Sequence, residues 1–317
     1  MKKLFLLAAS AMMILASCSK TEVVYQDQDP QEIGFFSIVK KQTKAAISGT
    51  EFNHTNMVVA ASISDSEAIE DGVYFGRTEF VPEGGYFKGG KYWPIQSATL
   101  DFLAVAPEVE DQVVTTFPNG AASATVVVTD NETNQHDVMY AAAEATKVAN
   151  VAPTAVGMEF NHALAWVFFK FKGDNNVTVN SIAVNARYNG TLTINNGENG
   201  LSVNWDDAPT TAQDVANVPG ADNNGVELTT AEQSFGNGLL VVPGTGVQFT
   251  ISYTITDPDG TTSHDYTYVY GDGDGENVEW AAGKKYTYSI SMNVNEIRID
   301  PRVTDWSAQN TTGVDIN

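Results

Sequence analysis

Short segments in which apolar and polar positions alternate recur along most of the chain. A two-residue period is typical of a β-strand that buries one face, and the segments are rich in β-branched and aromatic residues. Some of them are apolar at nearly every position, which indicates strands buried on both faces. The pattern predicts strands at residues 33–39, 57–62, 100–105, 124–128, 165–171, 181–184, 191–194, 238–242, 247–253 and 286–292.

Turn signals separate these strands, and helical periodicity is weak throughout. Glycine pairs, Asn-Gly steps and an Asp-Pro-Asp-Gly run are residues that reverse the chain direction readily. The best helix candidate is a short piece at residues 210–215. Many short strands joined by such turns are typical of β-sandwiches, so the sequence predicts an all-β protein. The turn signals lie at residues 84–85, 89–90, 189–190, 195–197 and 257–260.

The length of 317 residues is enough for two domains of ordinary size. Residues 149–157 contain Pro153 and Gly157 and little alternating pattern, so they mark a plausible boundary. The sequence therefore predicts an N-terminal domain of residues 45–156 and a C-terminal domain of residues 157–317.

The first residues have the order of a secretory signal: positive charge, a short apolar run and small residues before the cleavage point. Lys2 and Lys3 precede an apolar run of roughly 13 residues, shorter than the roughly 20 that a membrane-spanning helix needs. Residues 15–18, Leu-Ala-Ser-Cys, look like a lipobox. We expect residues 1–17 to be a signal peptide and Cys18 to carry a lipid that tethers the protein to the outer membrane. Because Cys18 is the only cysteine, intramolecular disulfides are excluded.

Charge is strongly unbalanced, with a formal net charge of −22. Nucleic-acid binding needs a basic patch, so the composition argues against such a partner. A spread of acidic charge favours solubility and repulsion between copies. The few basic residues include a local cluster, Lys40, Lys41 and Lys44, directly after the first predicted strand.

Several short motifs follow one another along the chain. They are Tyr92-Trp93-Pro94 with the apolar run and Pro107 at 100–107, then 137–141, 160–165, 240–243, 280–288 and 303–306. In this order, and together with the lipobox, they resemble the motifs of the fimbrillin family, the subunits of lipoprotein-derived (type V) pili in Bacteroidales bacteria. The resemblance implies two transthyretin-like β-sandwich domains in tandem.

The resemblance also implies a route of assembly for adhesion at the cell surface. A trypsin-like surface protease would cut after a basic residue near the end of the first strand, and a strand from another subunit would fill the groove that opens. Lys44-Ala45 stands at the family's cleavage position, with Lys40 and Lys41 as alternatives. Residues 18–44 would then be a lipidated leader that contains the removable first strand.

The family mechanism raises the question of which segment supplies the donor strand. The C-terminus is one candidate, because Val314 and Ile316 alternate with polar residues. Alternatively, these two side chains complete the last sheet of their own chain. Within the pilus the protein would be a stalk subunit, or else an anchor or tip subunit.

The physical chemistry of the first strand supports its removable role. Ile33, Phe35 and Val39 would share one face, with Phe36 and Ile38 on the other. Burying three or four such side chains contributes about 5–12 kcal/mol, the scale of a whole domain's stability. An empty groove of this kind should therefore capture another strand.

Catalytic and metal-binding signals are weak. None of the four histidines has the spacing of a metal site, and His162 fits a structural hydrogen-bonding role. Asp272, Asp274 and Glu276 alternate and could hold Ca²⁺, but a plain acidic turn explains them more simply. No nucleophile or phosphate-binding motif is present, so we expect neither enzymatic activity nor a cofactor.

Aromatic residues crowd residues 74–93 in the first half of the chain. They could form a sugar-stacking surface, and the alternative to a pilus subunit is then a monomeric glycan-binding surface lipoprotein. Packing of the strands in a core explains the aromatic residues more simply.

Overall fold

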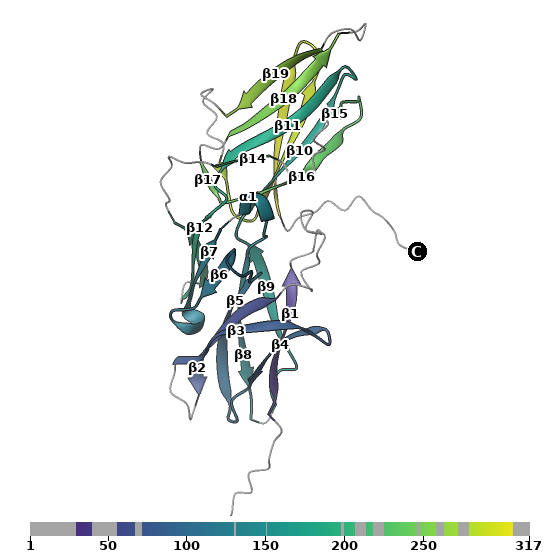
Figure 1. Cartoon of the computed structure of the whole chain (residues 1–317). Helices are drawn as coiled ribbons and strands as arrows, with labels where there is room; N and C mark the ends of the chain where they lie inside the picture. Colours follow the sequence, from purple (N-terminus) through teal and green to yellow (C-terminus); the bar gives the residue numbers. More distant parts are fainter. Residues whose placement is uncertain are drawn as a thin grey trace, which may run out of the picture.

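The computed structural model describes residues 30–39, 56–66, 72–129, 131–149, 151–197, 200–206, 214–217, 225–245, 248–257, 263–271 and 279–306. Strands dominate this part of the chain, so the all-β prediction is confirmed. The helical elements described there are one short α-helix, α1 (Asn131–Asn134), and one 3-10 turn, η2 (Gly120–Ala122). The molecule is elongated, with the early strands at the lower end of Figure 1 and the late strands at the upper end.

Seven strands of the first half close into a barrel. In spatial order they are β1 (Glu32–Val39), β4 (Tyr86–Tyr92), β3 (Gly72–Glu83), β2 (Met57–Ser66), β5 (Ala98–Ala106), β8 (Met139–Lys147) and β9 (Val156–His162). Neighbours are antiparallel except for β1 and β9, which run parallel. The barrel interior is a single apolar cluster in which Phe35, Phe80 and Phe102 are fully buried.

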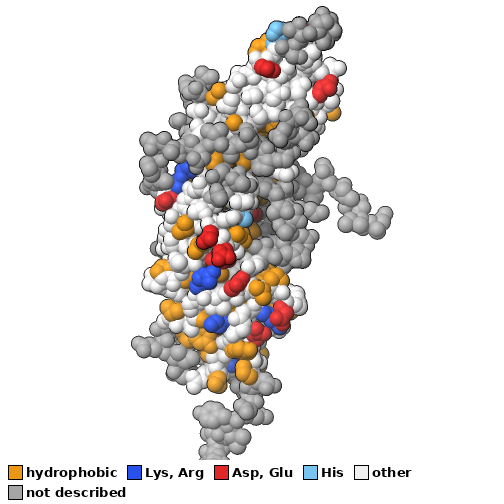
Figure 2. All heavy atoms as spheres, viewed as in Figure 1, with side chains coloured by type: hydrophobic (Ala, Val, Ile, Leu, Met, Phe, Trp, Pro, Cys, Tyr) orange, Lys and Arg blue, Asp and Glu red, His pale blue; other side chains and the backbone are white. Residues whose placement is uncertain are grey.

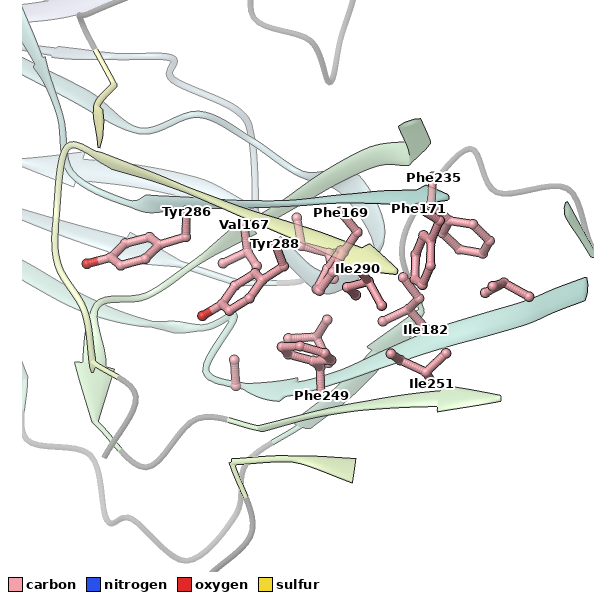
Figure 3. Close-up of a cluster of buried hydrophobic side chains, with 14 of the residues drawn as sticks. Val167, Phe169, Phe171, Ile182, Phe235, Phe249, Ile251, Tyr286, Tyr288 and Ile290 are labelled. Atoms are coloured by element: carbon pink, nitrogen blue, oxygen red, sulfur yellow. The ribbon is translucent and has the colours of Figure 1, made fainter. Parts of the chain in front are cut away.

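Two sheets of the second half face each other across an aromatic core. One has the order β16 (Gln233–Val241), β10 (Ala165–Gly173), β21 (Lys284–Met292), β22 (Ile297–Asp305). The other has the order β14 (Asp214–Asn217), β11 (Val177–Ala186), β18 (Gln248–Thr256), β19 (Ser263–Tyr270), and β15 (Val226–Glu227) also pairs with β11. Phe169, Phe249 and Tyr288 point toward one another between them (Figure 3), with ring centroids 4.9–5.7 Å apart. A short pair, β17 (Gly244–Thr245) and β20 (Glu279–Trp280), completes this half.

A further sheet takes strands from both halves of the sequence. Its order is β13 (Gly200–Trp205), β12 (Gly190–Gly197), β7 (Ser123–Val128), β6 (Val113–Thr116). We call it the bridging sheet. Its apolar side chains share one buried cluster with Val58 and Leu103 of the barrel strands β2 and β5. Because neighbouring residues on β2 and β5 face the barrel interior, these strands are buried on both faces, as their continuous apolar runs indicate.

All strand segments expected from the sequence overlap strands of the structure. The expected helix at 210–215 is wrong where it can be compared, since Asp214 and Val215 lie in strand β14, which pairs with β11. Its first residues lie outside the described part. The expected domain division at 156/157 falls inside β9, and the two-domain organisation stays a prediction.

Candidate functional site

The first strand, β1, is one of the seven strands that form the barrel wall. It pairs with β4 on one side, where Phe35 lies opposite Phe87, and with β9 on the other, from Phe35 opposite Val156 to Val39 opposite Phe160. Both of its edges are therefore occupied by backbone ladders. Removing β1 would leave two strands with unpaired N–H and C=O groups facing each other across a gap.

The side chains of β1 divide between the barrel interior and its outer surface, as the alternating pattern predicts. Ile33 and Phe35 are completely buried, whereas Phe36 is 40% exposed. The Phe35 ring meets Phe80 and Phe102 edge-on, with centroid distances of 5.0 and 5.1 Å. Burial of two such side chains contributes about 3–6 kcal/mol, so β1 stabilises the barrel substantially. The side chains of Ile38 and Val39 lie outside the description.

Polar contacts fix the start of β1. The Glu32 carboxylate accepts the Gly90 backbone N–H at 3.2 Å and lies 3.7 Å from the Lys88 ammonium. Lys88 also binds Glu83 at 2.9 Å, and this hydrogen bond and charge raise the pKa of Lys88 above its ordinary value. These groups are partly exposed, so their ion pairs set the register of β1 more than they stabilise it.

Most of the sequence-predicted site residues lie outside the described part of the chain. They are Cys18, Lys40, Lys41, Lys44, Ala45, Val314 and Ile316, together with Asp272, Asp274 and Glu276 of the acidic turn. Their positions in the sequence still matter, because Lys40 directly follows Val39, the last residue of β1. A cut in the lysine cluster would therefore fall just beyond the strand.

A second candidate group of polar and aromatic side chains lies where the barrel meets the second half of the chain. We call it the junction stack. The His162 ring nitrogen Nδ1 lies 3.0 Å from both carboxylate oxygens of Asp137, and the ring stacks on Trp306 at 3.8 Å with an angle of 7°. Trp306 in turn lies 5.8 Å from Trp166. The predicted hydrogen-bonding role of His162 is thereby confirmed.

Lys285 closes the junction stack on the far side of Trp166. Its ammonium lies 3.7 Å above the Trp166 ring and 4.9 Å from the Phe168 ring, a cation–π arrangement. Burial lowers the pKa of Lys285 to about 8, and the positive charge of Lys170 adds to this effect. The stack thus runs from a carboxylate through stacked rings to a partly desolvated amine.

The junction stack brings together motifs that are far apart in the sequence. Asp137, His162, Lys285 and Trp306 belong to the motifs at 137–141, 160–165, 280–288 and 303–306. Each motif is recognisable in the sequence by itself, but the place where they meet is not. No local pattern could reveal it, because the stack depends on strand pairings between distant segments.

The aromatic run at residues 74–93 divides between core and surface. Phe75, Phe87 and Trp93 are buried in the barrel core, whereas Tyr86 and Tyr92 are exposed. The core explanation is therefore confirmed for the first three residues. Within the described ranges, no group of three or more potential metal ligands occurs. A helix long and apolar enough to cross a bilayer is likewise missing from the residues described.

Comparison with known proteins identifies one family and several structures of similar fold. A family model described as fimbrillin-like matches residues 37–306. A fimbrial protein from Bacteroides vulgatus is 14% identical with a TM-score of 0.55, covering 87% of this chain and 99% of its own. A proposed cell adhesion protein from Bacteroides uniformis is 15% identical with a TM-score of 0.51 and the same coverages. No curated protein matches the sequence.

Proposed function

Because the chain belongs to the fimbrillin-like family, we propose that it is a structural subunit of a surface fimbria that assembles by strand exchange and serves adhesion. The role is mechanical and needs no catalytic chemistry. In this proposal the chain is exported as a lipoprotein held at the outer membrane through Cys18. Residues 45–156 and 157–317 are its two proposed domains, and β1 and β9 complete the barrel of the first one.

The observation that carries the proposal is the position of β1. The strand buries Ile33 and Phe35 in the barrel core, and the lysine cluster follows it at once. A trypsin-like surface protease that cuts after Lys40, Lys41 or Lys44 would free the strand without touching the barrel strands behind it. The emptied gap between β4 and β9 then offers two backbone edges and an apolar slot to an incoming strand.

The incoming strand comes from another subunit, and residues around Val314 and Ile316 supply it in our proposal. Their two-residue spacing equals that of Ile33 and Phe35, so both side chains can enter the slot on the same face. A donor that restores this burial recovers about 3–6 kcal/mol, which makes the exchange favourable once β1 has left.

The processing step is tested by replacing Lys40, Lys41 and Lys44 together with Gln and examining surface protein by mass spectrometry and electron microscopy. We expect the parent chain to start at Ala45, or after Lys40 or Lys41, and to form fibres. The triple variant should keep its leader and stay unpolymerised. Lys172→Gln, at an exposed position on β10, is the matched control and should behave like the parent.

Fibres of normal length from the triple variant would contradict the proposal. A parent chain that reaches the surface uncut, still beginning with a lipid-bearing Cys18, would instead indicate an anchor subunit or a monomeric surface receptor.

A further inference from the structure

The barrel end opposite the junction presents a group of exposed apolar side chains. Its residues are Tyr92, Ile95, Val148 and Val151, which are 47%, 82%, 65% and 71% exposed. We call this surface the barrel tip. It is formed by the connection from β4 to β5 and the connection from β8 to β9. Figure 2 shows hydrophobic side chains gathered at this lower end of the molecule.

The exposure of the barrel tip is built into the fold. The Lys147 ammonium, on a side chain that is 6% exposed, donates to the carbonyls of Pro94 and Ile95 at 2.6 and 3.1 Å. Val148 and Val151 exchange two backbone hydrogen bonds of 3.1 and 3.0 Å. Burying a lysine costs free energy unless its ammonium is hydrogen-bonded. The two hydrogen bonds therefore hold the connection from β4 to β5 in a defined geometry. The aliphatic side chains are thus held outward.

The barrel tip is also the end of the barrel at which β1 begins. The carbonyl of Gln31, the residue before β1, accepts the Trp93 N–H at 2.8 Å. The side-chain oxygen of Gln31 accepts the Ala152 N–H at 3.0 Å. At the other end, β1 finishes opposite Phe160, two residues before His162 and the junction stack. An incoming strand that runs in the direction of β1 therefore begins at the barrel tip.

The length of the proposed donor brings two copies into contact. Val314 lies eight residues after Trp306, a span of at most about 29 Å. If Val314 and Ile316 take the places of Ile33 and Phe35, next to the tip, Trp306 of the donating copy lies within that distance. A small domain has about this diameter, so a donor that runs in the direction of β1 brings the body of the donating copy close to the barrel tip.

We propose that the barrel tip is the docking surface for the body of a second copy of this chain. The inference rests on the proposed strand exchange and adds a second contact to it. Two copies of this acidic chain, whose full sequence carries a formal net charge of −22, repel each other at long range. Contact through these apolar side chains adds no like-charge pair between the copies, and their burial stabilises the contact.

The test compares the trypsin-trimmed parent chain with the double variant Ile95→Asp, Val151→Asp by light scattering and electron microscopy. Polymer formation by the variant should be at least tenfold slower. A synthetic peptide of residues 30–39 should bind both trimmed proteins equally, because the β1 slot is untouched. Val127→Asp, at a 43% exposed position on the bridging sheet, is the matched control and should polymerise like the parent.

The outcomes separate the two proposals. A trimmed parent chain that stays monomeric would overturn strand exchange and the docking surface together. Normal polymers of the double variant would overturn the docking surface alone. So would loss of peptide binding in the variant, which would place the defect in the slot. Normal polymers accompanied by loss of binding to neutral phosphatidylcholine vesicles would reassign the tip to a lipid surface.

Discussion

At the scale of single residues, Trp306 connects the end of the described chain to the barrel. The residue is 4% exposed, stacks on His162, and donates its backbone N–H to Gly283 at 2.8 Å. It follows directly after β22, which is otherwise an exposed edge strand. The ring therefore holds the end of that strand against both halves of the molecule.

Replacing Trp306 with Ala should lower the free energy of unfolding by about 3–5 kcal/mol, the range for removing a buried aromatic side chain. Trp306→Phe keeps a ring against His162 and should cost less than half as much. Guanidinium denaturation of the parent and both variants measures the difference. Equal midpoints for Trp306→Ala and the parent would show that the stack contributes nothing to stability.

Lys285 makes stability depend on pH in a defined direction. Its pKa is about 8 in the folded chain and about 10.5 when unfolded, so between these values the unfolded chain binds more protons. Stability should therefore rise from about pH 8 to about pH 10.5. Lys285 keeps partial solvent contact, and the Trp166 ring attracts the ammonium. We therefore expect the free energy of unfolding to rise by about 1–2 kcal/mol, less than the whole difference in pKa would give.

The variant Lys285→Met lacks this titration, and other ionisable groups are common to both proteins. Urea denaturation at pH 7.5 and pH 10 should show the parent gaining about 1–2 kcal/mol relative to the variant. Parallel stability curves would mean that Lys285 titrates at its ordinary pKa.

At the scale of elements, β1 offers a matched pair of neighbouring phenylalanines. Phe35→Ala should lower the free energy of unfolding of the untrimmed chain by about 3–5 kcal/mol, because the ring fills the barrel core. Phe36→Ala, at a 40% exposed position on the same strand, should cost less than about 1 kcal/mol. Thermal denaturation compares the two variants directly.

The same pair checks whether β1 is a true part of the barrel. After trimming, chains that carry either substitution are identical to the trimmed parent, so any remaining difference would contradict the assignment of the effect to β1. Equal losses of stability for Phe35→Ala and Phe36→Ala in the untrimmed chain would mean that the two faces of β1 contribute equally to the stability of the barrel.

Elements with strong local patterns were predictable from the sequence, and those with mixed patterns were not. The strands β2, β5 and β10 are continuous apolar runs, whereas β3 and β4 contain Gly76, Arg77 and the pair Gly89-Gly90 and were missed. The edge strand β22 was missed as well, since Pro301 and several charges interrupt it, as an edge position allows. The helix expected at 210–215 failed because pairing with β11 overrides a weak local preference.

At the scale of the whole molecule, the arrangement depends on pairings that no local pattern encodes. The bridging sheet pairs Thr193 with Thr125 and Ile194 with Ala124, so strands of the second half extend over the barrel. The junction stack likewise joins four distant motifs. The sequence could predict that the first strand forms and that His162 makes a hydrogen bond, but not that Trp306, Trp166 and Lys285 meet beside it.

The bridging sheet also constrains the order in which the protein can fold. During synthesis from the N-terminus, the barrel can close once β9 has been made. The outer face of β2 and β5, with Val58 and Leu103, is then covered by β6 and β7 alone, and the bridging sheet stays incomplete until β12 and β13 arrive. During that interval the incomplete chain exposes apolar surface, so we expect folding intermediates of this stage to be prone to aggregation.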